Sequence, residues 1–236
     1  MTSQLNLPLR LSDSASFDNF FAAGNEQVVA AVRAVLGPER PSPALFIHGP
    51  AGSGKSHLLQ ALSRLAIDAQ RLAVYAPAGA TGVSPELIAQ LNADTVVCVD
   101  DLDRIVGDQA WEENLLELYE RLAGGRGALV TAALQPPAGL DLKLAELSTR
   151  LVAGGAYRLR PLSDDMLPAA MRLRASVQGY ELPDSASQYL VRRAPRNSTA
   201  LFRILDRIDQ AALSRQRRIT VPFIKELEKE VSYSED

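Results

Sequence analysis

A glycine-rich segment that ends in lysine and serine carries the clearest chemistry in this sequence. Residues 49–56 read Gly-Pro-Ala-Gly-Ser-Gly-Lys-Ser, between an apolar run and a helical pattern. Glycines allow successive backbone N–H groups to point at phosphate oxygens, while the lysine reaches the outer phosphates and the serine ligates Mg²⁺. A purely structural turn needs neither residue. The predicted nucleotide contacts are Gly49, Pro50, Ala51, Gly52, Ser53, Gly54, Lys55, Ser56 and His57.

Two adjacent aspartates follow another apolar run. Val96 to Val99 leads directly into Asp100 and Asp101. A strand of this kind delivers one carboxylate to the magnesium shell, and the neighbouring carboxylate orients water. Paired aspartates also occur as plain loops or caps, but their place after a phosphate-binding loop favours function. We predict Asp100 and Asp101 as catalytic residues, Ser56 and Asp100 as Mg²⁺ ligands, and ADP or ATP as the cofactor.

Apolar runs alternate with helical patterns through the first two thirds of the chain. The predicted strands are 44–48, 72–76, 95–99 and 128–132. The helical patterns run through Leu58, Leu59, Leu62 and Leu65, from Ser84-Pro85-Glu86, and from Trp111 to the glycines at 124 and 125. This alternation predicts an α/β fold, a parallel sheet with helices on both faces.

The pattern changes near residue 161, after which three or four amphipathic helices follow without a convincing strand. The clearest apolar stripe is Leu201, Ile204, Leu205, Ile208 and Ala212. We therefore expect an N-terminal tail over 1–12, an α/β nucleotide-binding domain over 13–160 and a small α-helical lid domain over 161–236.

Composition narrows the class further. Apolar residues make up 47% and charged residues 22%, as in ordinary globular proteins. The sequence offers neither a basic, apolar leader nor about 18 consecutive uncharged apolar residues, so secretion and membrane spanning are not expected. A lone cysteine, Cys98, fits a core position in a cytoplasmic protein.

The net charge of −3 argues against a strong nucleic-acid binder. Arginines do gather between Arg192 and Arg218, where we favour a solvated helical face over a binding surface.

Several motifs occur in the order found in one family. Residues 17–20 (Phe-Asp-Asn-Phe), the glycine-rich loop, the Asp100-Asp101 pair, residues 148–151 (Ser-Thr-Arg-Leu) and the helical lid resemble the AAA+ domain of the bacterial replication initiator DnaA. The resemblance covers most of the chain. The DnaA helix-turn-helix DNA-binding domain has no counterpart here, so we expect another feature to localise the protein.

The N-terminal tail offers that feature. Residues 4–9 (Gln-Leu-Asn-Leu-Pro-Leu) resemble the short peptide with which bacterial replication proteins dock on the sliding clamp. The alternating leucines also fit an edge strand. Combined with a DnaA-like domain, the tail resembles the Hda family of regulatory inactivators of DnaA. The implied clamp contacts are Gln4, Leu5, Leu7, Pro8 and Leu9.

The Hda resemblance implies a reaction. A protein bound to the DNA-loaded β sliding clamp of DNA polymerase III stimulates hydrolysis of DnaA-bound ATP and so inhibits initiation of replication. Arg150 would be the catalytic arginine finger in trans, a contribution of about 10³ to 10⁵ in rate in GTPases. A surface arginine at a helix end is the simpler alternative. The implied partners are DnaA, the clamp and, through the clamp, DNA, while a homo-oligomer is left open.

Two departures from the DnaA pattern concern nucleotide sensing. Thr131 is followed by Ala132-Ala133-Leu134, where DnaA-like domains usually offer a polar sensor, so that only Thr131 or Gln135 remains to compensate. In the lid, Thr199, or Arg196 on a shifted register, stands at the place of the second sensing arginine. We therefore expect the protein to activate a partner's ATPase more than to turn over its own ATP, with ADP as a structural or regulatory ligand.

Two other classes stay open. An autonomous ATPase, such as a helicase loader or a DnaA-like remodeller acting on DNA, predicts turnover in isolation and DNA binding through the lid arginines. The weakened sensors speak against it. A small-molecule kinase would have only the phosphate-binding loop in common with this sequence. The ordered match to the DnaA motifs makes that class less favoured.

Overall fold

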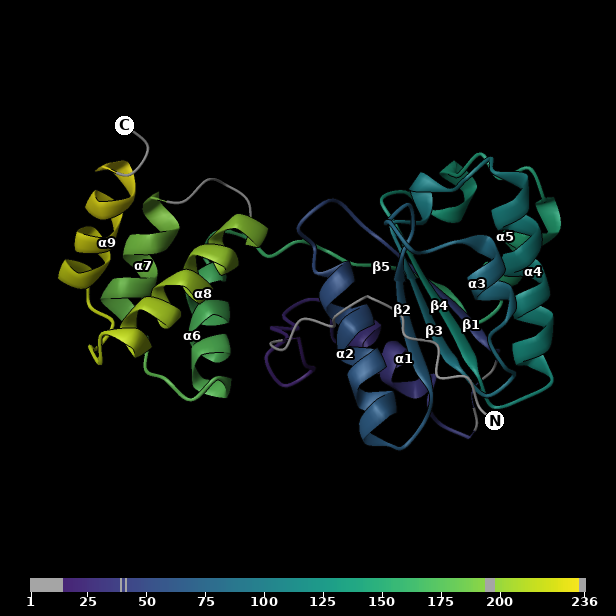
Figure 1. Cartoon of the computed structure of the whole chain (residues 1–236), viewed down its shortest axis with the longest axis horizontal. Helices are drawn as coiled ribbons and strands as arrows, with labels where there is room; N and C mark the ends of the chain where they lie inside the picture. The colour runs from purple at the N-terminus through teal and green to yellow at the C-terminus, as the bar shows by residue number, and fades with distance from the viewer. Residues whose placement is uncertain (1–14, 39, 41, 194–197, 234–236) are drawn as a thin grey trace. The chain divides into compact units, whose positions relative to one another are not determined.

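The computed structural model describes residues 15–38, 40, 42–193 and 198–233. The chain divides into two compact units, shown in Figure 1. The first contains Gly24–Pro161 and the described residues up to Phe17, and the second contains Asp18–Ala23 and the chain from Leu162.

A five-stranded parallel sheet forms the centre of the first unit, in the order β2-β3-β4-β1-β5. The strands are β1 (Ala44–His48), β2 (Ala73–Pro77), β3 (Val96–Asp100), β4 (Ala128–Ala133) and β5 (Ala156–Arg158). Every residue of β3 and β4 is buried, which explains why these strands read as continuous apolar runs. The four predicted strands are confirmed to within one residue, whereas β5 was not predicted.

Helices cover both faces of this sheet (Figure 1). α1 (Glu26–Ala34) and α2 (Lys55–Asp68) lie on one face, and α3 (Pro85–Ala89), α4 (Gln109–Ala123) and α5 (Ala145–Leu151) lie on the other. The predicted start of α3 is confirmed, since the Ser84 side chain accepts a hydrogen bond from the Leu87 N–H, with Pro85 in the first turn. The α/β prediction is therefore correct. Two short 3₁₀ helices, η1 (Leu102–Arg104) and η2 (Pro137–Gly139), follow β3 and β4.

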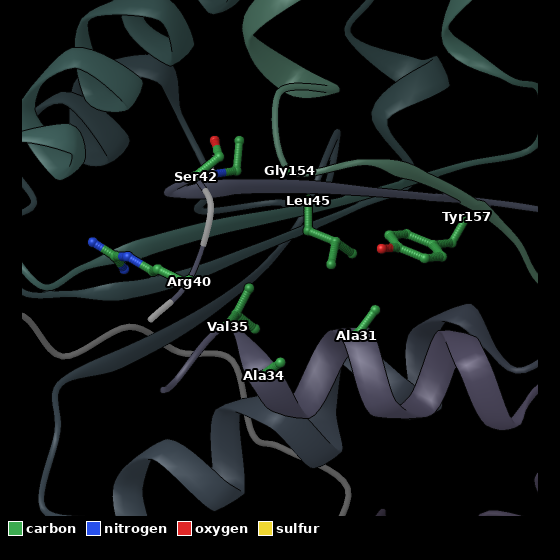
Figure 2. Close-up of a pocket in the computed structure, with 9 residues that line it drawn as sticks. Ala31, Ala34, Val35, Arg40, Ser42, Leu45, Gly154 and Tyr157 are labelled. Atoms are coloured by element: carbon green, nitrogen blue, oxygen red, sulfur yellow. Dashed lines mark hydrogen bonds between the residues drawn. The ribbon is translucent and has the colours of Figure 1, made fainter. Parts of the chain in front are cut away.

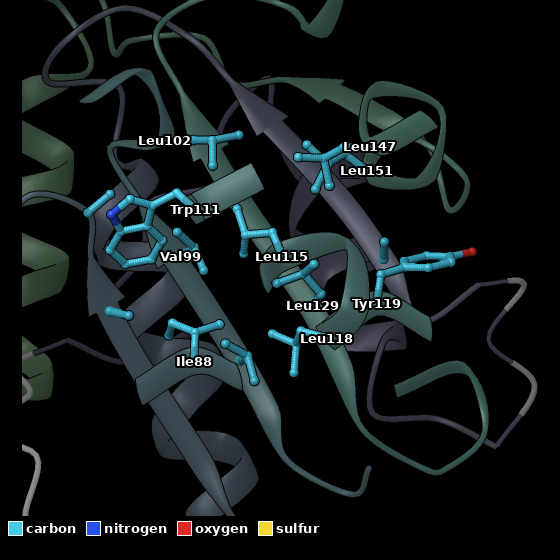
Figure 3. Packing of buried hydrophobic residues seen from close by; sticks show 14 of the residues in the cluster. Ile88, Val99, Leu102, Trp111, Leu115, Leu118, Tyr119, Leu129, Leu147 and Leu151 are labelled. Atoms are coloured by element: carbon cyan, nitrogen blue, oxygen red, sulfur yellow. The ribbon is translucent and has the colours of Figure 1, made fainter. Parts of the chain in front are cut away.

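An apolar core joins the sheet to α3, α4 and α5 (Figure 3). Val99 and Leu129 from the sheet pack with Leu115 and Leu118 of α4 and with Leu147 of α5. Burial of each large apolar side chain contributes roughly 1.5–3 kcal/mol. This core gives the strand ends that carry the candidate site a rigid support.

The second unit is a helical bundle. Its helices are α6 (Leu167–Val177), α7 (Asp184–Arg193), α8 (Ser198–Ser214) and α9 (Val221–Tyr233). The predicted apolar stripe of α8 is largely buried, and Leu205 packs with Met171 of α6 and Phe223 of α9. Arg174 of α6 is itself buried, and it forms a forked ion pair with Asp206 at 2.9 Å. Within the residues described here, this unit contains no strand, as predicted.

None of the helices that the structure describes is both long and apolar enough to span a membrane. Cys98 on β3 is fully buried, as expected.

Candidate functional site

The glycine-rich loop joins β1 to α2, and its glycines are needed for geometric reasons. Gly52 and Gly54 have φ values of 78° and 98°, in the left-handed region that glycine tolerates best. A Cβ on Gly49 would lie 2.3 Å from the carbonyl oxygen of Leu159. The Gly49 N–H also donates to the carbonyl of Ala133 at 3.2 Å, which ties the start of the loop to the end of β4.

Lys55 opens α2 and folds back over the loop. Its side-chain ammonium donates to the carbonyls of Gly49 at 2.7 Å and Pro50 at 3.1 Å. Burial lowers the pKa of Lys55, and the nearby carboxylates, Asp100 first, oppose that shift. A partly desolvated cation is therefore held directly above the loop.

The loop also presents an unsatisfied donor. The Ser53 hydroxyl is buried and has no hydrogen-bond partner among the described residues. Buried polar groups nearly always have partners, so a hydroxyl of this kind inside a glycine-lined loop fits a phosphate oxygen. The residues present therefore fit a nucleotide.

The donors available for a metal fit Mg²⁺ bound together with phosphates. The described residues contain no group of three or more His, Cys, Asp or Glu placed to hold a metal ion. Mg²⁺ commonly takes one or two protein ligands and completes its shell with phosphates and water. Ser56 and Asp100 are the residues that would hold the ion in this way.

Asp100 and Asp101 have different environments. Asp100, 2% exposed at the end of β3, accepts hydrogen bonds from the Asp101 N–H at 3.0 Å and from the Tyr75 hydroxyl at 2.8 Å. The Asp101 backbone has a φ of 52°, in the left-handed region, and its carboxylate forms an ion pair with Arg104 at 3.5 Å. Burial raises the pKa of Asp101, and the Asp100 charge raises it further. The structure thus brings both aspartates near Lys55 but directs them to different partners.

Strand β4 and the loop after it, where a nucleotide-sensing residue was expected, present few polar side chains. Thr131 is fully buried in β4, and its hydroxyl has no partner within the described part of the chain. Gln135 is exposed in the loop that follows. The Leu134 N–H donates to the Asp103 carboxylate at 2.7 Å, while its apolar side chain is 51% exposed. Sequence reasoning missed Asp103, which reaches this loop from η1 and acts electrostatically on Lys55.

Arg150 lies away from this loop. It belongs to α5, which covers the face of the sheet opposite to α2 (Figure 1). Its guanidinium contacts Glu120 of α4 at 3.2 Å and Glu146 at 3.0 Å, and it lies over the Tyr119 ring. The side chain remains 40% exposed.

His57 hydrogen-bonds to the backbone, and His48 lies near an aromatic ring. His57 Nε2 lies 2.8 Å from the carbonyl oxygen of Ser16. The rings of His48 and Phe46 are 6.4 Å apart, and burial lowers the pKa of His48. Trp111 and Tyr119 lie in the apolar core of the first unit.

Some predicted residues fall outside the described residues, namely the tail residues 4–9 and Arg196. Thr199 lies in the first turn of α8. Three arginines of the 192–218 stretch form ion pairs at the surface of the second unit, which agrees with a solvated helical face. These pairs are Arg193–Glu228, Arg215–Glu230 and Arg217–Glu226.

A small pocket of about 80 Å³ lies elsewhere in the first unit (Figure 2). It is lined by Ala31, Ala34, Val35, Arg40, Ser42, Ala44, Leu45, Gly154 and Tyr157. It lies at the amino end of β1, whereas the glycine-rich loop follows the carboxyl end. Arg40 donates to backbone carbonyls of residues 125–127, so its donors already serve the fold.

A parallel sheet with a glycine loop leading into a helix, a strand-end aspartate and a separate helical bundle define a P-loop nucleotide-binding protein of the AAA+ class. Comparison with family models gives three matches: the bacterial DnaA ATPase domain over residues 11–76, the lid domain of Hda over residues 164–227, and an RNA helicase model over residues 45–122. Residues 11–76 and 164–227 are thus similar to the DnaA ATPase domain and to the Hda lid domain, which supports an Hda/DnaA-like protein.

Solved structures share this fold. Domain III of the Thermotoga maritima replication initiation protein DnaA superposes with a TM-score of 0.74 at 18% identity, covering 94% of this chain and 98% of that one. AMPPCP-bound DnaA from Aquifex aeolicus gives 0.66 at 19% identity, over 84% and 66% of the two chains. The Thermotoga maritima RuvB Holliday junction branch migration motor gives 0.63 at 19% identity, over 90% and 70%. The AAA+ fold with a helical lid is therefore confirmed.

Proposed function

We propose that this DnaA-related replication regulator stimulates hydrolysis of DnaA-bound ATP in trans while docked on the DNA-loaded β sliding clamp of DNA polymerase III. Residues 4–9 dock on the clamp, and the glycine-rich loop binds ADP or ATP with Mg²⁺. The product is ADP-bound, inactive DnaA.

The observation that carries this proposal is the position of Arg150. Its helix α5 covers the face of the sheet opposite to α2, the helix into which the glycine-rich loop leads, and the Arg150 side chain is 40% exposed near the end of α5. An arginine placed there serves a nucleotide on a neighbouring molecule better than one in its own loop. In that role the guanidinium would stabilise the charge that develops on the outer phosphate in the transition state.

The protein's own nucleotide has a supporting role in this proposal. Lys55 and the loop N–H groups bind the phosphates, and Ser56 and Asp100 hold Mg²⁺, which neutralises phosphate charge when bound. Thr131 of β4 is buried and Leu134, which follows the strand, is apolar, so this segment supplies little to orient an attacking water. The arrangement therefore favours a retained nucleotide over rapid turnover.

The decisive experiment compares ATP hydrolysis by DnaA with and without this protein, each with and without clamp loaded on DNA. The protein alone is measured in parallel. We expect clamp-dependent acceleration of DnaA and little turnover by the protein alone. Substantial turnover in isolation with no effect on DnaA would overturn the proposal in favour of an autonomous ATPase.

A further inference from the structure

Tyr75 connects the edge strand β2 to the aspartate of the candidate magnesium site. Its hydroxyl donates a hydrogen bond of 2.8 Å to Oδ2 of Asp100. In the parallel register Tyr75 pairs with Cys98, which precedes Asp100 by two residues on β3. Alternate residues of a strand point to the same face, so the register places both side chains on one face of the sheet.

The same hydroxyl lies near α2. Burial raises the pKa of Tyr75 and the Asp100 charge raises it further, while Gln60 and Ser56 of α2 act in the opposite direction. The group that donates to Asp100 is therefore close to Ser56, the other residue that would hold Mg²⁺.

Two hydrogen bonds from the described residues hold the Asp100 carboxylate in place. The residue is 2% exposed, and the hydrogen bonds that the described residues give its carboxylate come from the Asp101 N–H and Tyr75. The first donor is fixed by the backbone at the end of β3. Tyr75 is the side chain that fixes the second oxygen.

We propose that Tyr75 is a positioning residue of the magnesium site, whose hydroxyl orients Asp100 for Mg²⁺ bound with a nucleotide. The inference rests on the nucleotide site of the proposed function, and it is independent of the clamp and of DnaA.

A competing role for the hydroxyl is to block the metal. A carboxylate offers about four lone-pair directions, and Tyr75 and Asp101 use two of them. Enough remain for a cation or its bound water. Carboxylates that ligate metals are commonly held by such outer partners, and loss of one typically costs 10- to 100-fold in metal affinity. The geometry therefore favours positioning over blocking.

The test is the substitution Tyr75→Phe, with ADP affinity measured by calorimetry in Mg²⁺ and in excess EDTA. We expect the gain in affinity that Mg²⁺ provides to fall about 10-fold or more. The affinity in EDTA should stay unchanged, because the phosphate contacts of the loop remain. A general structural defect would lower both affinities together.

Tyr157→Phe is the matched control, since Tyr157 lies on β5, the edge strand at the other side of the sheet. It should change neither affinity. In an Asp100→Asn background, Tyr75→Phe should have no further effect on the Mg²⁺ gain, because the two side chains act as one unit.

An unchanged or larger Mg²⁺ gain in Tyr75→Phe would overturn the positioning role while leaving the nucleotide site intact. Absence of ADP binding by the wild-type protein would instead overturn the nucleotide site itself, and the positioning role with it. Thermal unfolding without nucleotide checks that the variant is folded.

Discussion

The guanidinium Nε of Arg150 lies 3.2 Å from a carboxylate oxygen of Glu120, a residue of the neighbouring helix α4. The other end of the guanidinium donates to Glu146, one turn earlier on α5. A finger that engages a partner's phosphate has to leave or share these carboxylates. Exposed ion pairs of this kind are worth about 0–1 kcal/mol, so the arginine is oriented without being trapped.

The double substitution Glu120→Gln and Glu146→Gln should raise the stimulation of DnaA. Both carboxylates compete with the phosphate for Arg150, and removal of about 1 kcal/mol of competing interaction corresponds to roughly 5-fold in rate. Single-turnover hydrolysis of DnaA-bound ATP on clamp-loaded DNA measures the effect. Glu117→Gln, also exposed on α4, is the control. Lower stimulation would show that the carboxylates present the arginine instead of restraining it.

Arg150→Ala should abolish stimulation, a loss of about 10³-fold or more, because nothing else replaces the charge at the partner's phosphate. Folding and clamp binding should persist, since the side chain is partly exposed and its ion pairs are weak. Arg126→Ala removes another exposed, ion-paired arginine of the same unit and should have no effect. Full stimulation by the Arg150 variant would disprove the finger assignment.

The loop, the aspartate pair and four of the strands could be predicted because each is a local pattern. β5 could not, since it has three residues and none of them is fully buried. Tyr75 reaches Asp100 only through the register of two strands distant in sequence, and Glu120 reaches Arg150 only through the packing of α4 on α5. Neither relationship leaves a periodic signal in the sequence.

The tail prediction calls for a binding experiment. Replacement of Gln4, Leu7 and Leu9 together by alanine should abolish binding to the sliding clamp, because the glutamine and the alternating apolar side chains fill its pockets. Surface plasmon resonance with immobilised clamp measures the loss. Nucleotide affinity serves as the internal control and should not change. Undiminished clamp binding would refute the docking role of residues 4–9.

Gly49→Ala should destabilise the first unit and abolish nucleotide binding. The added Cβ would lie 2.3 Å from the backbone oxygen of Leu159, and a backbone atom cannot move aside as a flexible side chain can. Overpacking of this kind costs about 1–3 kcal/mol and shifts the loop that binds phosphate.

Gly124→Ala is the matched control for that substitution, because its Cβ would meet the Arg121 carbonyl at an ordinary 3.6 Å and its φ is −80°. Thermal unfolding with and without ADP separates the two effects of Gly49→Ala. The variant should show a lower melting temperature and no rise on addition of ADP, whereas the control should behave as the wild type. An ADP-dependent rise in Gly49→Ala would mean that the loop tolerates a side chain there and that phosphate binding does not depend on its contact with Leu159.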